Sequence, residues 1–170
     1  NIAISMAQLD KKVLLVDTDI RRGRLHRTFG AKRSKGLRQY LTEDASVEDI
    51  IQKTAIPNLS VVTPGENIIM GSELLLSSKM TEFIQEARRK FDLVIYDTPP
   101  ITLISDASVL ISQLHGVVYV CRAGLTRSRI VPKALSMIAG ADTRLIGVVL
   151  NSTSSLNEGY GKYYNRYYTN

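Results

Sequence analysis

The fold of this 170-residue chain is predicted by one stretch of its sequence, Val13-Leu14-Leu15-Val16-Asp17-Thr18-Asp19-Ile20-Arg21-Arg22. The four leading apolar residues indicate a strand buried on both faces, as in a parallel α/β sheet. Ligands of such sheets lie beyond the carboxyl ends of the strands, where Asp17 and Asp19 follow. Strand alternation predicts that both carboxylates point to the same side. Together with the arginines, they suit a metal ion, a phosphate, or both.

A second strand ends in the same way, because Leu93-Val94-Ile95-Tyr96 leads into Asp97 and then Thr98-Pro99-Pro100. Proline cannot continue a central strand, so the strand is expected to end at Asp97. Asp97 should therefore lie at the same sheet edge as Asp17 and Asp19, where carboxylate oxygens suit Mg²⁺. Turns alone explain a single aspartate at a strand end. Two such strand ends, one of them followed by two arginines, favour a site for a metal ion or a phosphate.

The rest of the chain alternates strands and helices, which predicts an α/β domain with a mostly parallel, doubly wound sheet over residues 1–151. Strands are expected at residues 12–17, 58–62, 93–97, 116–121 and 144–150. Helices are expected at residues 1–9, 47–53, 78–90, 107–114 and 127–139. Ser46 and Asp49 resemble a capping box at the start of one of these helices. Residues 152–170 are predicted to be a flexible tail.

The composition is that of a globular protein with an uneven charge distribution. Hydrophobic residues make up 44% of the chain, and the formal net charge is +6. Much of the positive charge clusters early, in Arg21, Arg22, Arg24, Arg27, Lys32, Arg33, Lys35 and Arg38. Such a patch suits nucleic acid, anionic lipid or a phosphorylated partner, or is simply a solvated face. The only cysteine, Cys121, gives no disulfide framework, which is consistent with the cytosol.

The C-terminal end is rich in tyrosine. Five of the eight tyrosines fall in the last eleven residues: Tyr160, Tyr163, Tyr164, Tyr167 and Tyr168. The segment has neither a helical nor a strand period. Taken alone, it is equally consistent with a docking tail and with an aromatic segment that stacks on single-stranded nucleic acid.

In combination, these segments resemble the bacterial tyrosine kinases of capsular and exopolysaccharide biosynthesis, which are relatives of the MinD/ParA-like P-loop ATPases. Residues 13–22 resemble their second Walker motif, and residues 91–100 resemble their Walker B segment. Residues 71–75, 105–107 and 147–151 also align with segments of the family. The resemblance implies a P-loop NTPase-like fold and an ATP-dependent protein-tyrosine autokinase that regulates polysaccharide synthesis and export.

The resemblance also implies roles for individual residues. Asp97 and Asp19 are expected to hold Mg²⁺, and Asp17 to accept the tyrosine proton, although the roles of Asp17 and Asp19 are interchangeable at this stage. Arg21 joins them in the catalytic set. Asn151 matches a position that recognises the adenine of ATP, or is a turn-forming asparagine. Asp106 lines the site, or caps the helix that follows it. The five tail tyrosines listed above are the expected phosphoacceptors.

The phosphate-binding sequence G-x-x-x-x-G-K-[ST] is absent from these 170 residues. The expectation is a chain truncated at its N-terminus, without its first strand and P-loop. Two alternatives to the kinase follow: a MinD/ParA-like ATPase switch without kinase activity, and an inactive phosphoacceptor or scaffold fragment.

The resemblance implies several partners and a location. The expected partners are a membrane-embedded polysaccharide co-polymerase or activator, separate or fused, further copies in a ring oligomer, and a tyrosine phosphatase. Nucleic acid is not an expected partner. The expected location is cytoplasmic, peripheral to the inner face of the plasma membrane.

Overall fold

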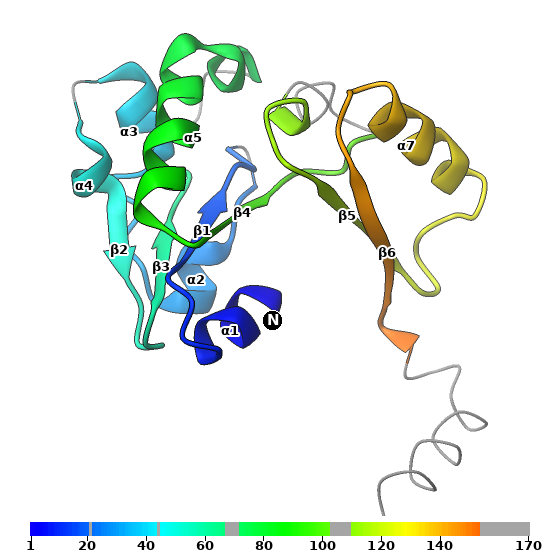
Figure 1. Ribbon diagram of the computed structural model, residues 1–170, viewed down its shortest axis with the longest axis horizontal. Helices are drawn as coiled ribbons and strands as arrows, with labels where there is room; N and C mark the ends of the chain where they lie inside the picture. The colour runs from blue at the N-terminus through cyan, green and yellow to red at the C-terminus, as the bar shows by residue number, and fades with distance from the viewer. Residues whose placement is uncertain (21, 44, 67–71, 103–109, 154–170) are drawn as a thin grey trace, which may run out of the picture. The chain divides into compact units, whose positions relative to one another are not determined.

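The computed structural model describes residues 1–20, 22–43, 45–66, 72–102 and 110–153 (Figure 1). The chain divides into two compact units, Asn1–Leu110 and Ile111–Asn170. No helix in the described ranges is long and apolar enough to cross a membrane.

The first unit is built on a four-stranded sheet with the order β2-β3-β1-β4. Strand β1 (Val13–Asp17) pairs in parallel with both β3 (Leu59–Val62) and β4 (Leu93–Asp97). The short strand β2 (Ile51–Lys53) pairs with β3 in the antiparallel sense. All five residues of β1 are buried, as the continuous apolar run predicts. The predicted parallel α/β architecture is therefore confirmed for this unit, with an antiparallel strand at one edge.

Helices cover both faces of this sheet, giving three layers (Figure 1). On one face, Ala3 and Ala7 of α1 (Ile2–Gln8) pack into one buried cluster with Val13 and Leu15 of β1. The short helix α2 (Leu25–Phe29) adds partly buried residues to that cluster. Because alternate strand residues face opposite sides, Leu14 and Val16 point to the other face.

The helices of that other face pack against one another: α3 (Leu37–Thr42), α4 (Val47–Ile50), the 3₁₀ helix η1 (Ser72–Leu76) and α5 (Ser78–Lys90). The rings of Tyr40 in α3 and Phe83 in α5 lie 5.5 Å apart, centroid to centroid. Phe83 is fully buried, as are Met80 and Ala87 on the same face of α5. The predicted helix at residues 78–90 is thus confirmed to the residue.

The predicted helix at residues 47–53 is wrong in its second half. Ser46 does cap α4, since its side chain accepts the N–H of Asp49 at 3.2 Å. The Ser46 N–H donates in return to Asp49 Oδ2 at 3.0 Å. The helix nevertheless ends at Ile50, because residues 51–53 pair with β3. Pairing with a neighbouring strand is a tertiary contact that overrides the local helical pattern. Helices α2 and α3, both short, were not predicted.

The described part of the second unit, residues 111–153, has two parallel strands and a helix. Strand β5 (Val117–Arg122) pairs with β6 (Leu145–Asn151), so that Arg122 lies opposite Asn151. Helix α7 (Ile130–Ala139) contacts β5 and begins three residues later than the predicted helix at 127–139. Of the helix predicted at residues 107–114, residues 107–109 lie outside the described part of the chain, Leu110 and Ile111 are helical, and residues 112–114 form a turn and a bend, so the helix ends earlier than predicted.

Candidate functional site

The two aspartate-terminated strands meet at one edge of the first sheet. Asp17 and Asp97 are register partners, because β1 and β4 run side by side in parallel. Thr18 joins the two strand ends: its backbone N–H donates to the Asp97 carbonyl at 2.9 Å, and its hydroxyl donates to the same oxygen at 2.7 Å. The carboxyl edge of the sheet therefore brings Asp17, Asp19 and Asp97 into one region, as the sequence predicts. Thr18 was missed by the sequence reasoning, although its position between two aspartates offered a signal.

Asp17 is fully buried, and its carboxylate accepts hydrogen bonds from backbone N–H groups of the loop that follows it. One of its oxygens, Oδ1, accepts the N–H of Asp19 at 3.2 Å, and Oδ2 accepts the N–H of Leu25 at 3.1 Å. Strand β1 ends at Asp17, so a turn, not strand alternation, places Asp19 near it. The predicted strand end at Asp17 is confirmed, but strand alternation does not extend to Asp19, and the two carboxylates differ in environment.

Burial raises the pKa of Asp17 from 3.8 to about 6. The hydrogen bond from the Leu25 N–H opposes this rise, and the neighbouring charge of Asp97 adds to it. A carboxyl group with a pKa near neutrality is suited to proton transfer. Its complete burial, however, denies a protein substrate direct access to it in this structure.

Gly23 closes the space around the Asp17 carboxylate. A Cβ atom at this position would lie 2.4 Å from both Asp17 oxygens and 2.5 Å from Cγ of Pro64. These distances are far below van der Waals contact, so no other residue fits without displacing the loop. The absence of a side chain at Gly23 therefore keeps Asp17 in place.

We expect Gly23→Ala to lower the free energy of unfolding by about 1–3 kcal/mol, the usual range for overpacking a buried site. The measurement is urea unfolding followed by circular dichroism. Gly140→Ala is the matched control, because its added methyl group would come no nearer than 3.5 Å to any atom beyond the two adjoining residues. Equal urea midpoints for the two variants would show that the loop around Asp17 accommodates the added methyl group without loss of stability, contrary to this prediction.

Asp97 and Asp19 remain in contact with solvent. The Asp97 side chain is exposed and that of Asp19 half-buried. Partial loss of hydration and the negative charge of Asp19 both raise the pKa of Asp97. The turn holds Asp19 in place, because its Oδ1 accepts the N–H of Arg22 at 2.8 Å. Two nearby carboxylates that repel each other at a sheet edge are suited to a divalent cation.

The donor set fits magnesium bound together with a nucleotide. Among the described residues, no three His, Cys, Asp or Glu side chains form a group that could hold a metal ion by themselves. Mg²⁺ commonly uses one or two carboxylates and takes its other ligands from water and substrate phosphates. Asp97 and Asp19 are the carboxylates of this edge that solvent reaches.

Asn151 belongs to the second unit, where it ends β6. Its side-chain Oδ1 accepts the N–H of Ser152 at 2.8 Å, and its carbonyl accepts the N–H of Ala123 at 2.9 Å. The Asn151 side chain is exposed, and Ser152 has a positive φ of 60°. This geometry is that of a turn-forming asparagine, and it leaves the amide group at the surface. Arg21, Asp106 and the five tail tyrosines lie outside the described residues.

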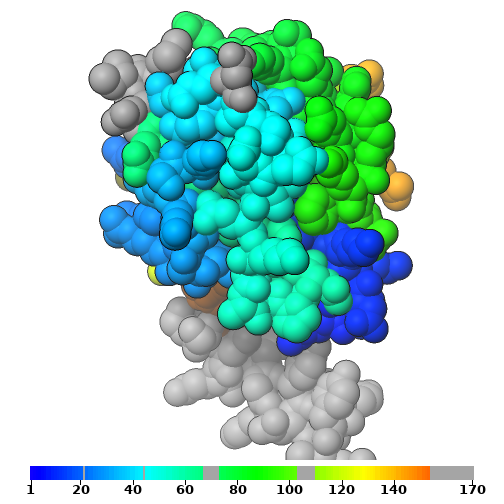
Figure 2. Space-filling view, turned by 90° about the vertical axis from the view of Figure 1, so that its left-hand side faces the viewer, coloured from blue at the N-terminus to red at the C-terminus, as the bar shows by residue number. Residues whose placement is uncertain are grey.

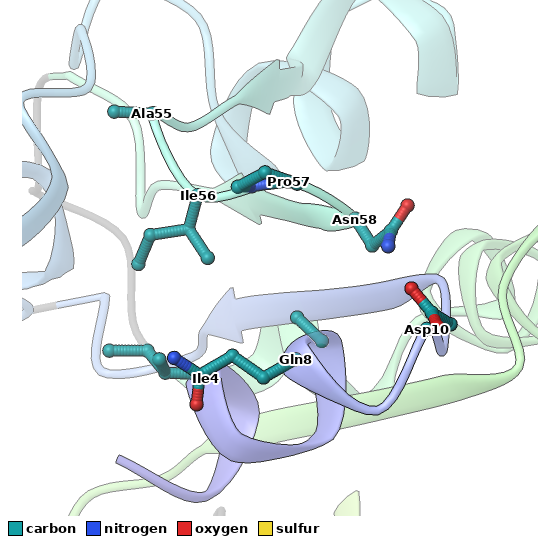
Figure 3. Close-up of a pocket in the computed structure, with 8 residues that line it drawn as sticks. Ile4, Gln8, Asp10, Ala55, Ile56, Pro57 and Asn58 are labelled. Carbon is teal, nitrogen blue, oxygen red and sulfur yellow. The ribbon is translucent and has the colours of Figure 1, made fainter.

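An open apolar cavity of about 510 Å³ lies elsewhere in the first unit (Figure 3). It is bordered by Ile4 and Gln8 of α1 and by the loop from Ala55 to Asn58. Asp10, which also lines it, precedes β1, and Asn58 precedes β3. The cavity is therefore at the amino ends of these strands, on the edge opposite the three aspartates.

The fold and the aspartate-bearing edge are those of α/β proteins, whose ligands commonly bind at the carboxyl ends of parallel strands. The sequence model described as "AAA domain" matches residues 1–122. The chain is 37% identical, over 94% of its length, to the tyrosine-protein kinase ptk of Acinetobacter johnsonii, of which it spans 22%. It is 35% identical to the tyrosine-protein kinase CpsD of Streptococcus agalactiae, covering 97% of this chain and 72% of CpsD.

Among solved structures, the kinase domain of the Escherichia coli tyrosine kinase ETK is similar, with a TM-score of 0.84 and 33% identity. The alignment covers 88% of this chain and 59% of that domain. On these similarities, the chain belongs to the family of bacterial tyrosine-protein kinases.

Proposed function

We propose that the protein containing this chain transfers the γ-phosphoryl group of ATP to tyrosine side chains, including those of its own tail. The observation that carries this proposal is the parallel register of Asp17 with Asp97, which brings the solvent-accessible Asp97 and Asp19 to the same edge of the sheet. The family of the chain supports the same reaction. Regulation of capsular or exopolysaccharide synthesis is part of the proposal.

In the proposed reaction, the tyrosine oxygen forms a bond to the γ-phosphorus as the bond from that phosphorus to the β,γ-bridging oxygen breaks, releasing ADP. The tyrosine proton passes to a carboxylate. Tyrosine has an ordinary pKa near ~10 and is protonated at neutral pH, so a base assists. A bound Mg²⁺ would neutralise charge on the phosphates; Asp97 would hold it, with water and phosphate oxygens as its other ligands.

Access decides between the two candidate bases. Asp17 is fully buried with both oxygens bound to backbone N–H groups, whereas Asp19 reaches solvent. We therefore assign the proton acceptor to Asp19 and a positioning role to Asp17, which holds the turn that carries Asp19. This assignment moves the proton acceptor from Asp17 to Asp19, a possibility that the resemblance left open.

The remaining proposals concern ligands and partners. ATP with Mg²⁺ is the proposed cofactor pair, with Asn151 and Asp106 on the nucleotide side. A membrane-embedded co-polymerase or activator, further copies in a ring, and a tyrosine phosphatase are the proposed partners. The proposed location is the cytoplasmic face of the plasma membrane. These proposals are supported by the family resemblance of the sequence and by the cytosol-compatible single cysteine.

The test is phosphotyrosine formation in Mg²⁺-ATP, measured by antibody and by mass spectrometry of residues 152–170. Two proteins are compared: the 170-residue chain, and a longer protein that also contains any residues encoded upstream of it. We expect phosphotyrosine to depend on Asp19, and to be lost with Asp19→Asn. Replacement of the five tail tyrosines by phenylalanine should remove most of the signal.

Other outcomes identify the alternatives. ATP hydrolysis without phosphotyrosine, even with a membrane activator added, would identify an ATPase switch. Phosphorylation only by a separate kinase would identify a phosphoacceptor, an alternative favoured by the lack of a P-loop sequence in these residues.

A further inference from the structure

The three aspartates of the carboxyl edge differ in how their carboxylates are held. Both oxygens of Asp17 accept backbone N–H groups, and Oδ1 of Asp19 accepts the N–H of Arg22. Among the described residues, the exposed carboxylate of Asp97 has no hydrogen-bond or ion-pair partner. Its direction therefore depends on the backbone that carries it. This dependence matters because Asp97 is the residue proposed to hold Mg²⁺.

The backbone at Asp97 is fixed from the neighbouring strand by Thr18. The paired register of β1 and β4 ends with Asp17 opposite Asp97. One residue further along, the Thr18 N–H and the Thr18 hydroxyl both donate to the Asp97 carbonyl, at 2.9 and 2.7 Å. A carbonyl oxygen has two lone pairs and can accept both bonds. Two donors from one residue thus hold the peptide group between Asp97 and Thr98 in one orientation.

The strand that carries Asp97 cannot extend its own pairing. Asp97 is followed by Thr98-Pro99-Pro100, and proline has no N–H to donate to a neighbouring strand. The Thr18 hydroxyl therefore adds a bond at the position where the ladder between the two strands ends. The Thr18 carbonyl in turn accepts the N–H of Ile20 at 2.9 Å, within the turn that carries Asp19. One residue thus joins the end of β4 to that turn.

Burial determines what kind of role Thr18 can have. Its side chain is only 1% exposed, so its hydroxyl is not available to a ligand or to a phosphoryl group. Helices α3, α4 and α5 lie side by side over one face of the sheet, in light blue, cyan and green in Figure 2. Asp97 meets solvent at the carboxyl edge. Thr18 can therefore influence a ligand of this edge only through the residues that it bonds.

We propose that Thr18 is a positioning residue for the metal site: its hydroxyl fixes the Asp97 peptide group, and this orients the Asp97 carboxylate for Mg²⁺ bound with the nucleotide. Groups that orient metal ligands without touching the metal commonly change metal affinity by about 10- to 100-fold. A serine at this position would keep the hydroxyl. A valine would keep the branched shape and remove the hydrogen bond. The inference rests on the metal site of the proposed function, and not on transfer of the phosphoryl group.

The test is direct binding of Mn²⁺, a paramagnetic substitute for Mg²⁺, measured by electron paramagnetic resonance in the presence of ADP. It uses the longer protein that also contains any residues encoded upstream of this chain. Thr18→Val should weaken Mn²⁺ binding by about tenfold, and Thr18→Ser should keep the affinity within about twofold of the parent protein. Equal affinities of the parent protein and Thr18→Val would overturn the proposal, and so would a parent protein that binds no Mn²⁺ with ADP.

Thr63→Val is the matched control, because Thr63 follows β3 as Thr18 follows β1. Thr63 is fully buried, and its hydroxyl donates to the Lys32 carbonyl at 3.2 Å. Strand β1 separates β3 from β4, so this bond is remote from Asp97. The two valine variants should lose similar amounts of stability in urea unfolding, but only Thr18→Val should lose metal affinity. Equal weakening of Mn²⁺ binding by both valine variants, or by Thr18→Ser and Thr18→Val, would contradict a specific role of the Thr18 hydroxyl.

The kinase assay gives a second readout. Thr18→Val should need about tenfold more Mg²⁺ for half of its maximal rate, and should approach the parent rate at saturating Mg²⁺. A lower maximal rate with unchanged Mg²⁺ dependence would exclude a role in the metal site. The two proposals can fail separately. Thr18-dependent Mn²⁺ binding without phosphotyrosine would overturn only the kinase, and phosphotyrosine with unchanged Mn²⁺ binding in Thr18→Val would overturn only the role of Thr18.

Discussion

Asp97→Asn is expected to reduce phosphotyrosine formation at least about 100-fold, because it removes a charge that would hold Mg²⁺ and neutralise the transferred phosphoryl group. The fold should remain, since the structure uses the carbonyl of Asp97, not its side chain, to anchor Thr18. The Asp97 side chain is exposed, so an asparagine side chain fits at this position. The measurement is the initial rate of phosphotyrosine formation at several Mg²⁺ concentrations, beside the thermal unfolding temperature.

Asp92→Asn provides the control on the same segment. Asp92 is exposed and lies at the opposite end of β4, where its Oδ2 accepts the N–H of Lys12 at 2.8 Å. Asparagine retains an acceptor oxygen, so this variant should keep both activity and fold. An Asp97→Asn rate within about threefold of the parent rate would remove Asp97 from the proposed magnesium site.

Asp17 should make the stability of the first unit depend on pH. Its folded-state pKa of about 6 lies above its ordinary value of 3.8. Between these values the folded protein keeps a proton that the unfolded chain has lost, so the free energy of unfolding falls as pH rises. The gap corresponds to a loss of up to about 3 kcal/mol between pH 4 and pH 7. Burial, the main cause of the shift, is complete at this side chain.

Asp17→Asn isolates this effect from other titrating groups. The amide has one acceptor oxygen for the two N–H groups of Asp19 and Leu25, so the variant should be less stable at pH 4 by about 1–3 kcal/mol. Because asparagine does not titrate, its deficit should shrink as the pH rises to 7. Urea unfolding of both proteins at pH 4, 5, 6 and 7 measures the difference. Parallel profiles would mean that Asp17 titrates at its ordinary pKa, and would contradict the assigned burial effect.

The strand ends were predictable because their signal is local. A run of apolar residues followed by aspartate, and in one case by two prolines, is enough to locate β1 and β4 and to place their ends together. The helix at 78–90 was predicted equally well; in the structure Ser77 caps it by accepting the N–H of Met80 at 3.2 Å, and one face of the helix is buried. By contrast, residues 51–53 carry no local sign that they pair with β3, and their strand was missed.

The two aspartates of the first motif show where sequence reasoning stops. Asp17 and Asp19 are the same residue type two positions apart, and strand alternation treated them as equivalent. The structure separates them, because β1 ends at Asp17 and the turn back to Leu25 buries one carboxylate while leaving the other accessible. The assignment of proton acceptor and positioning residue follows from that difference.

The sequence by itself determined the fold class, the two strands that end in aspartate, the family, and the aspartates of the candidate site. These follow from apolar runs and residue types, which act over a few neighbouring positions. Only the tertiary structure decided which carboxylate is buried, that Gly23 must lack a side chain, and that the Thr18 hydroxyl bonds to the Asp97 carbonyl. Those properties depend on atoms brought together from distant positions, such as Asp97 against Thr18 and Thr63 against Lys32, and burial and charge are set by such contacts.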